Sequence, residues 1–488
     1  MEVEGLFAAS DLPSALARAI QLHAARPALS RGDETWTYQR LGLEISRVAE
    51  ALRGRPGPML YSPSNTPMGV AIIFGAVAAG KVPVLPDPTW TDAERLEVVR
   101  RCGVQTVIAE QELTAPWLGA GARVGGIVLH EVALHGEERA AVTPRPDTAF
   151  CRFTSGTTGF SRCLEFSWTA ALAAARSWWQ AVRYHQDDVL LCLATLNNGL
   201  AFNTSLLAAL LPGAHLVFHG GPLIPSSLAA TTRRFSPTSL VAFPFVYDAL
   251  AGARHRLELS RLRLAVSSAA PLKPESGAAF LAGYGVPVAN YYGLVEAGPC
   301  TFNDGSVPGS VGAPLSGVSF KIFAEPGGEA GADERGPVGR LGVKSEAMAS
   351  GFLDRGGPPL AESLDGDGYY LTNDLASLDA RGHLFLHGRL GRLMNIEGRK
   401  IDPGEVEQVI RGLSGVSDAL VRAETANGRL LIAAYVESAA AQVEDLVEVL
   451  RVHLAPYKRP QRIQVLSRFP RSAAGKVLLS QLTSSGEV

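Results

Sequence analysis

A short segment near residue 155 concentrates the residue types that bind phosphate groups. Glycines let backbone amides approach phosphate oxygens closely, and hydroxyl side chains add hydrogen-bond donors. Arg162 follows the segment and adds a positive charge. The spacing differs from that of a Walker A loop, and the alternative interpretation is an ordinary polar turn. We predict a phosphate-binding loop formed by Thr154, Ser155, Gly156, Thr157, Thr158 and Gly159.

A second segment places aromatic rings close to a carboxylate. Tyr291 and Tyr292 precede Gly293, and Glu296 follows three residues later. An aromatic face suits a purine base, and a carboxylate is a hard oxygen ligand for Mg²⁺. Alternatively, the tyrosines are core residues at a strand end and the glutamate begins a helix. The first interpretation predicts that these residues bind a nucleotide and its metal ion.

Asp374 and Arg389 form a third candidate pair. A carboxylate offers two oxygens side by side, which suits the two hydroxyls of a ribose. A lone aspartate in a turn is usually only a turn residue. The argument therefore depends on the order and spacing of this pair relative to the other segments.

Four segments, in this order, resemble the motifs of the adenylate-forming superfamily of acyl-CoA synthetases, nonribosomal-peptide adenylation domains and luciferases. The matching stretches are TSGTTG at 154–159, YYGLVE at 291–296, TND at 372–374 with GR at 388–389, and PRSAAGK at 470–476. The resemblance covers nearly the whole chain. It implies an enzyme that uses ATP and Mg²⁺ to convert a carboxylic acid into an acyl-AMP, with release of pyrophosphate.

The resemblance also implies roles for individual residues. Tyr292 would stack on adenine, and Glu296 would hold Mg²⁺. Asp374 and Arg389 would bind the ribose. Lys476 would bridge the substrate carboxylate and the α-phosphate, because a cation between two like charges lowers their repulsion.

The chain departs from the superfamily pattern at several positions. Ser161, Arg162 and Cys163 stand where the pattern has Pro-Lys-Gly. Arg162 keeps the charge for a pyrophosphate contact, although its planar fork differs from a lysine. Val295 replaces a residue that usually carries a hydroxyl, and Arg392 occupies the hinge position that is commonly Asp or Lys.

The resemblance also outlines a substrate pocket. Small residues at Ala269 and Ala270 would let the adenine and the acid lie against the backbone. No acidic residue stands where amino-acid-activating relatives hold an α-amine, which favours an aryl or medium-chain acid. The predicted pocket residues are Asn197, Asn198, Phe243 and Gly293.

The second half-reaction needs an acceptor for the acyl group. No carrier-protein segment with the Asp-Ser-Leu attachment pattern is present, which favours coenzyme A as the acceptor. A separate carrier-protein thiol is the next alternative, and direct amide formation with an amine is the third. A hypothesis of another class is a degenerate, non-catalytic binder of a nucleotide or an acid.

Composition narrows the class of protein further. The 488 residues contain 47% hydrophobic residues and carry a formal net charge of −2, which fits a globular protein and gives no indication of a nucleic-acid partner. Five cysteines without CxxC spacing favour a reducing, cytoplasmic location. No apolar run is long enough for a membrane span. The oligomeric state is left open.

Alternating helical and strand patterns must position these residues. Periodicity predicts helices at 38–52 and 91–102 and strands at 104–109 and 239–242, a rhythm typical of parallel sheets covered by helices. Short Gly- and Pro-rich strands follow from about residue 309. We predict an α/β fold with αβαβα layers and a small β-barrel in residues 1–389. A small, mobile α+β domain with the catalytic lysine is predicted for residues 392–488.

Overall fold

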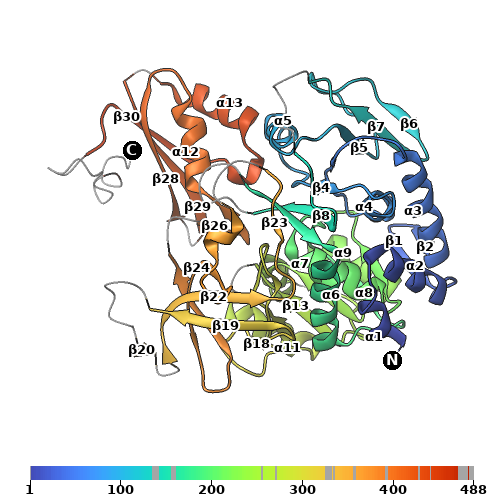
Figure 1. Ribbon diagram of the computed structural model, residues 1–488. Helices are drawn as coiled ribbons and strands as arrows, with labels where there is room; N and C mark the ends of the chain where they lie inside the picture. Colours follow the sequence, from blue (N-terminus) through green and yellow to red (C-terminus); the bar gives the residue numbers. More distant parts are fainter. Residues whose placement is uncertain are drawn as a thin grey trace. The chain divides into compact units, whose positions relative to one another are not determined.

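A computed structural model describes most of the chain, and it divides into two compact units. The first contains Met1–Pro88, Val98–Thr154 and Cys163–Leu390, and the second contains Thr89–Glu97, Ser155–Arg162 and Gly391–Val488. Figure 1 shows the order of the elements along the chain. The described residues are 2–134, 142–154, 161–253, 256–269, 272–324, 332–333, 336–354, 359–390, 394–426, 429–439, 441–470 and 482.

A seven-stranded sheet forms one layer of the first unit. Its order is β14-β13-β12-β10-β11-β1-β2, and every neighbouring pair is parallel except β1 and β2. The turn between β1 and β2 is short, which only an antiparallel pair allows, and Gly32 there adopts a φ of 58°. The strands are β1 (Pro27–Arg31), β2 (Glu34–Thr37), β10 (Val189–Cys192), β11 (His215–Phe218), β12 (Ser239–Ala242), β13 (Leu264–Ser267) and β14 (Val288–Asn290).

An eight-stranded sheet is parallel at its centre and antiparallel at both edges. Its order is β23-β9-β8-β4-β3-β5-β7-β6, with parallel pairing from β8 to β5. The predicted parallel sheets are therefore mixed sheets, because strands that follow each other along the chain, such as β8 and β9, pair antiparallel at the edges. The strands are β3 (Met59–Tyr61), β4 (Pro83–Leu85), β5 (Thr106–Ala109), β6 (Ala122–Val124), β7 (Ile127–Glu131), β8 (Thr148–Phe153), β9 (Cys163–Ser167) and β23 (Gly351–Phe352).

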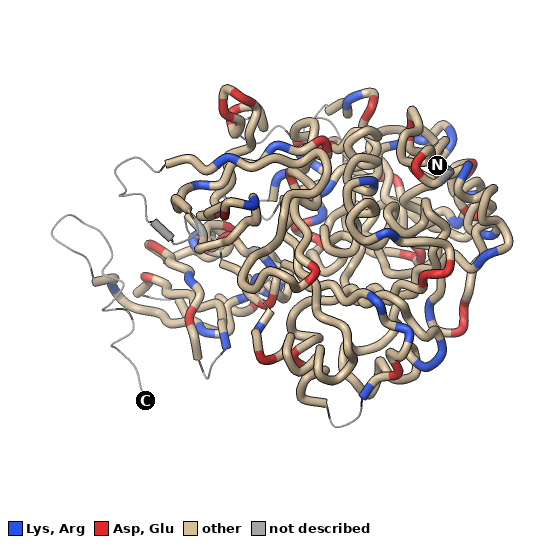
Figure 2. Tube along the Cα trace, turned by 90° about the horizontal axis from the view of Figure 1, so that it is seen from below, with Lys and Arg blue, Asp and Glu red and all other residues tan. Residues whose placement is uncertain are grey.

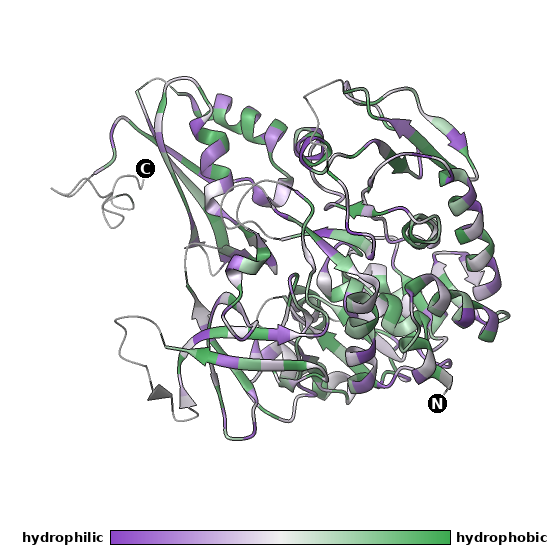
Figure 3. Ribbon diagram, in the orientation of Figure 1, coloured by the Kyte–Doolittle hydropathy of each residue, from purple (hydrophilic) through white to green (hydrophobic). Residues whose placement is uncertain are grey.

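Local signals in the sequence set the helix starts. Thr37 and Thr66 cap α3 and α4, each accepting a hydrogen bond from a backbone amide of the first turn. Nearly every side of α4 is buried, and it is hydrophobic all round in Figure 3, as expected for a helix packed within a core. Helices of this unit are α2 (Leu12–Leu22), α3 (Tyr38–Leu52), α4 (Pro67–Ala78), α6 (Trp168–Val182), α9 (Pro225–Phe235), α10 (Pro244–Ala251) and α11 (Pro274–Tyr284).

A four-stranded antiparallel sheet lies in the region where the sequence predicts a small barrel. Its order is β19-β22-β24-β25, with register shifts in β22–β24 and β24–β25. These irregularities bend the strands, as bulges do in strongly curved sheets. The strands are β19 (Val318–Phe323), β22 (Gly339–Ser345), β24 (Tyr370–Leu378) and β25 (Leu384–Arg389).

The second unit has the α+β character that the sequence predicts. Its three-stranded sheet has the order β28-β29-β30, and two helices contribute side chains to its core. Val406 and Ile410 of α12 and Leu446 of α13 are buried in this cluster. The elements are β26 (Met394–Ile396), β27 (Arg399–Ile401), α12 (Pro403–Arg411), β28 (Val416–Ala426), β29 (Arg429–Ser438), α13 (Val443–His453) and β30 (Arg462–Leu466).

The charged residues, the cysteines and the helices agree with the composition of the chain. Acidic and basic residues are scattered along the trace in Figure 2, without a long stretch of one sign. All five cysteines are buried, and none of them forms a disulfide. Across the described residues, no helix is long and apolar enough to cross a bilayer.

Candidate active site

The candidate nucleotide residues gather around a hairpin that follows strand β14. Tyr292 immediately precedes β15 (Gly293–Leu294), which pairs with β16 (Gly298–Pro299). The Tyr292 hydroxyl donates to Asp374 Oδ2 at 2.5 Å, and both side chains are buried. The fold thus joins an aromatic ring and a carboxylate that are 82 positions apart in sequence.

Strand β24 positions both candidate carboxylates. Asp374 belongs to this strand, and its amide donates to Thr372 Oγ1 at 3.0 Å. Tyr370 of the same strand donates its hydroxyl to Glu296 Oε1 at 3.2 Å. Because Glu296 also accepts the Ala349 amide at its carbonyl, at 2.8 Å, the turn that carries it is held from two sides.

Gly293 is a position where a side chain would not fit. A Cβ there would lie 2.9 Å from Tyr291 Cε2 and 3.0 Å from the Gly298 carbonyl oxygen. The glycine therefore permits the tight pairing of β15 with β16. It follows that Gly293 shapes the hairpin between Tyr292 and Glu296.

The two adjacent tyrosines lie in different surroundings. Tyr291 packs edge-on against Trp178, with ring centroids 5.0 Å apart. Burial raises the pKa of the Tyr291 hydroxyl well above its ordinary value. Both tyrosines are buried, in different hydrophobic clusters, and only the Tyr292 hydroxyl is seen to reach a candidate ligand-binding carboxylate. A role for Tyr291 in cofactor binding stays a prediction.

Ala269 follows strand β13 with an unusual backbone conformation. Its φ is 74°, in the left-handed region that costs a residue with a Cβ some conformational energy. The neighbouring Ser268 hydroxyl donates to the Tyr291 carbonyl at 2.7 Å and ties this turn to the tyrosine segment. Strained backbone of this kind clusters at ligand-binding sites.

Several predicted site residues lie outside the described part of the chain. Thr154 directly follows strand β8, and Arg162 directly precedes β9; both are partly buried. The roles of the remaining residues stay predictions. Outside the description are Ser155, Gly156, Thr157, Thr158, Gly159, Ala270, Arg392 and Lys476, together with the side chain of Arg389.

The predicted pocket residues have structural partners of their own. Asn198 Oδ1 accepts the Leu200 amide at 2.8 Å and caps a short helical segment. Asn197 Nδ2 donates to Asp87 Oδ2 at 3.0 Å. Phe243 stacks on Phe245 at a centroid distance of 6.0 Å. A role for these three residues in acid binding stays a prediction.

The structure contains a cavity that sequence reasoning missed. Its described lining combines three phenylalanines and several alanines with two polar side chains, Arg152 and Asn203. Val295, next to Glu296, also lines it. Asn203 belongs to a π-helical segment, Phe202–Leu206, and such segments are frequent at functional sites. The available signal was an arginine in the mostly apolar and buried strand β8.

A buried lysine links separated parts of the second unit. Lys458 Nζ donates to Glu405 Oε1 at 2.7 Å and to Glu94 Oε1 at 2.8 Å. Burial raises the pKa of Glu405, although the lysine opposes this effect. Trp90 Nε1 donates to the Tyr457 hydroxyl at 3.1 Å beside this group. Sequence reasoning missed this cluster, because its members are far apart in the chain.

The described residues are compatible with Mg²⁺ bound together with a nucleotide. They contain no cluster of three or more His, Cys, Asp or Glu side chains suited to a metal ion. Mg²⁺ in nucleotide sites usually takes one or two carboxylates, substrate phosphates and water. A single carboxylate at Glu296 fits that donor set.

Comparison with known proteins places the chain in a family. The AMP-binding enzyme family matches residues 16–353, and the AMP-binding enzyme C-terminal domain matches residues 405–476. The chain is therefore a member of the AMP-binding enzyme family, the class that the motifs resemble. Its adenylate-forming fold has an α/β N-terminal part and a smaller C-terminal part.

Individual relatives are similar over most of their length. A 3-hydroxybenzoate–CoA/4-hydroxybenzoate–CoA ligase of Thauera aromatica is 26% identical, and the match covers 90% of each chain. The solved o-succinylbenzoate CoA synthetase of Bacillus subtilis has a TM-score of 0.79 and 22% identity, covering 97% of this chain and 99% of that one. An amide bond synthetase of Marinactinospora thermotolerans has a TM-score of 0.75 and 23% identity, covering 96% and 98%. The two structures establish a shared fold.

Proposed function

We propose that this protein is an ATP-dependent ligase that adenylates a carboxylic acid and then transfers the acyl group to coenzyme A. The observation that carries the proposal is the joining of Tyr292, Asp374 and Glu296 by strand β24. An aromatic ring and two carboxylates next to the β15–β16 hairpin suit a nucleotide and its metal ion. The hydroxybenzoate ligase of Thauera aromatica supports an aryl acid as the first substrate to test.

The arrangement of the site residues along the sheets supports this proposal. Tyr292 follows strand β14, Ala269 follows β13 and Asn197 follows β10, so all three lie beyond the carboxyl ends of parallel strands. Ligands of α/β sheets bind in the crevice at this end. The proposed nucleotide site thus lies where the backbone geometry favours one.

In the proposed mechanism, the Asp374 carboxylate accepts hydrogen bonds from the ribose hydroxyls, and the Tyr292 ring stacks on adenine. Asp374 must exchange its hydrogen bond from Tyr292 for one from ribose, or accept both, since a carboxylate has lone pairs for each. Arg162 contacts the pyrophosphate and Lys476 stabilises the charge where the substrate carboxylate meets the α-phosphate. When bound at Glu296, Mg²⁺ would neutralise phosphate charge.

Pyrophosphate and AMP release from ATP and Mg²⁺ tests the proposal directly. The panel contains benzoates with different ring substituents, medium-chain fatty acids and amino acids, each with and without coenzyme A. We expect AMP release with an aryl acid that rises sharply when coenzyme A is present. Pyrophosphate exchange that does not depend on coenzyme A would support adenylation. It would also indicate that the acyl acceptor is a carrier-protein thiol or an amine. Absence of turnover with every acid contradicts the proposal.

Two variants test the residue roles. Lys476→Ala is expected to lower adenylation at least about 100-fold, because the group that stabilises the developing charge is lost. Lys344→Ala is a matched control, since the Lys344 amine donates to the Asp367 carbonyl in an exposed position. Undiminished pyrophosphate release by Lys476→Ala would exclude the catalytic role of that residue.

A further inference from the structure

The cavity beside Val295 contains a buried positive charge. Arg152 is 3% exposed and lines this cavity together with Asn203. Of the described residues in the lining, Arg152 is the one that carries a charge. A charged group that is removed from water normally has a counter-charge, because an isolated buried ion is strongly destabilising.

The protein compensates the Arg152 charge only in part. Its Nη2 donates to the Asn197 carbonyl at 3.2 Å, and its guanidinium lies 4.8 Å from the centre of the Phe202 ring. Its Nε is buried without a hydrogen-bond partner. Within the described part of the chain, no carboxylate forms an ion pair with this guanidinium. Burial lowers the pKa of Arg152 to about 10, which leaves the side chain charged at neutral pH.

A second donor faces the same space. Arg152 Nη2 and Asn203 Nδ2 lie 3.5 and 3.6 Å from the position that a Cβ on Gly199 would occupy. The two donors therefore approach a common point beside Gly199, which is not itself among the residues that line the cavity. Around them the walls are aromatic: the ring of Phe150 lies 5.5 Å from that of Phe166 and 4.7 Å from that of Phe202. The cavity measures about 20 Å³, which is room for about one water-sized polar group beside the guanidinium.

We infer that the acid substrate carries a second negatively charged group, which Arg152 binds in this cavity. This inference rests on the proposed function. The substrate class is a dicarboxylic acid with an apolar, preferably aromatic, body. One carboxyl group is adenylated near Glu296, and the other pairs with the guanidinium. Val295 connects the two places, because it lines the cavity and directly precedes Glu296. A planar guanidinium pairs with a carboxylate through two parallel hydrogen bonds.

The test compares matched acids on the full-length wild-type protein. Each dicarboxylic acid is paired with the acid in which a methyl group replaces one carboxylate: benzene-1,4-dicarboxylate with 4-methylbenzoate, benzene-1,3-dicarboxylate with 3-methylbenzoate, and aliphatic diacids of several lengths with their monoacids. The readout is kcat/KM for pyrophosphate release. We expect at least one diacid to exceed its partner by at least about 10-fold, the lower range for a charge-assisted hydrogen bond.

Arg152→Met then removes the charge and keeps a side chain of similar length. It is expected to lower kcat/KM for the preferred diacid about 100-fold, and to leave or raise the value for the monoacid. Arg152→Lys keeps the charge and should retain part of the preference. Arg263→Met is the matched control, because it also removes a guanidinium but from an ion pair with Asp188. The control should leave the ratio of diacid to monoacid unchanged.

The outcomes separate this inference from the proposed function. If monoacids are adenylated and no diacid is preferred, the second-charge inference is wrong and the ligase proposal stands. If Arg152→Met lowers kcat/KM equally for the diacid and the monoacid, Arg152 has only a structural role. If no acid is turned over, thermal shift of the wild-type protein by the diacids decides: stabilisation that Arg152→Met abolishes supports the inference, and its absence overturns it.

Discussion

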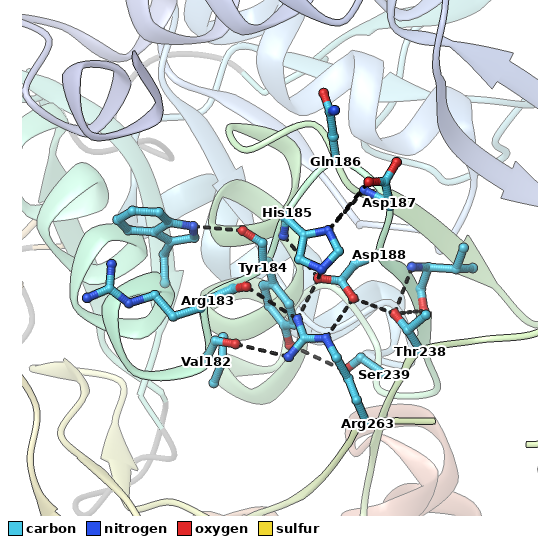
Figure 4. Close-up of polar contacts among 12 residues, drawn as sticks. Val182, Arg183, Tyr184, His185, Gln186, Asp187, Asp188, Thr238, Ser239 and Arg263 are labelled. Atoms are coloured by element: carbon cyan, nitrogen blue, oxygen red, sulfur yellow. Dashed lines mark hydrogen bonds and ion pairs between the residues drawn. The ribbon is translucent and has the colours of Figure 1, made fainter. Parts of the chain in front are cut away.

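Arg152 lies in strand β8 and Arg263 directly precedes strand β13, and different groups neutralise the charges of these two arginines. Arg263 precedes β13 and donates to both carboxylate oxygens of Asp188, through Nε at 2.8 Å and Nη2 at 2.5 Å. Thr238 also donates to Asp188, at 2.6 Å. Figure 4 shows these side chains converging on the one carboxylate. Arg152, by contrast, has a backbone carbonyl and an aromatic ring as its described partners.

The two arginines also lie at opposite ends of their strands. Asp188, Thr238 and Arg263 directly precede the parallel neighbours β10, β12 and β13, so their cluster lies at the amino ends. Arg152 is near the carboxyl end of β8, directly before the predicted phosphate loop. In α/β sheets the carboxyl ends carry ligand sites. We infer from this difference that the Arg263 ion pair mainly stabilises the fold, whereas Arg152, which has no ion pair among the described residues, binds a ligand.

The largest effect on stability is expected from removing the paired cation. Arg263→Met leaves the Asp188 carboxylate, which is fully buried, without its counter-charge. Breaking a buried pair costs about 3–5 kcal/mol, and we expect about 2–3 kcal/mol here because 37% of the Arg263 side chain is exposed. Chemical denaturation measures the free energy of unfolding. A loss below about 0.5 kcal/mol would contradict a structural role for the pair.

Acid sensitivity gives a second, smaller effect. Burial alone would raise the pKa of Asp188, but hydrogen bonds from Arg263, Thr238 and the His185 amide outweigh it and hold the pKa below its ordinary value. The stabilisation is therefore complete above the unfolded-state pKa, about 3.9, and is lost as pH falls through the lower folded-state value. Asp188→Asn should unfold with a shallower pH dependence between about pH 5 and pH 3. Identical pH profiles would contradict this assignment.

Deleting single hydroxyls extends the comparison to the candidate active site. Tyr292→Phe removes the hydrogen bond to the buried Asp374, and we expect a loss of stability of about 1 kcal/mol and a KM for ATP changed several-fold. Tyr370→Phe is the matched variant, because its hydroxyl bonds Glu296 at the longer distance of 3.2 Å. Thermal melts and initial rates at varied ATP measure both. Equal KM values for wild type and both variants would exclude a role for these two hydroxyls in nucleotide binding.

The smallest effect on stability is expected for Arg152, which forms no ion pair with another described residue. Arg152→Met replaces a buried charge by an apolar side chain, so stability should stay within about 1 kcal/mol of wild type or rise. Chemical denaturation alongside Arg263→Met makes the comparison direct. A loss for Arg152→Met as large as that for Arg263→Met would show that its described contacts stabilise the fold.

Patterns that depend on near neighbours in the chain predicted much of the structure. The helix predicted at residues 38–52 is α3, Tyr38–Leu52, because its apolar spacing and the Thr37 cap are both local. The strand predicted at 239–242 is β12, Ser239–Ala242. Motif order likewise indicated the family that comparison then established. The roles of the individual site residues stay predictions.

By itself, then, the amino-acid sequence determined which helices and strands form and to which family the chain belongs, since both depend on local spacing and motif order. Only the tertiary structure decided which side chains meet. The Tyr292–Asp374 hydrogen bond joins residues 82 positions apart, and the antiparallel edges of the sheets arise from pairing between strands. Nor does a sequence show whether a buried arginine has a partner. That depends on which residues fold around Arg152, and long-range packing alone brings them there.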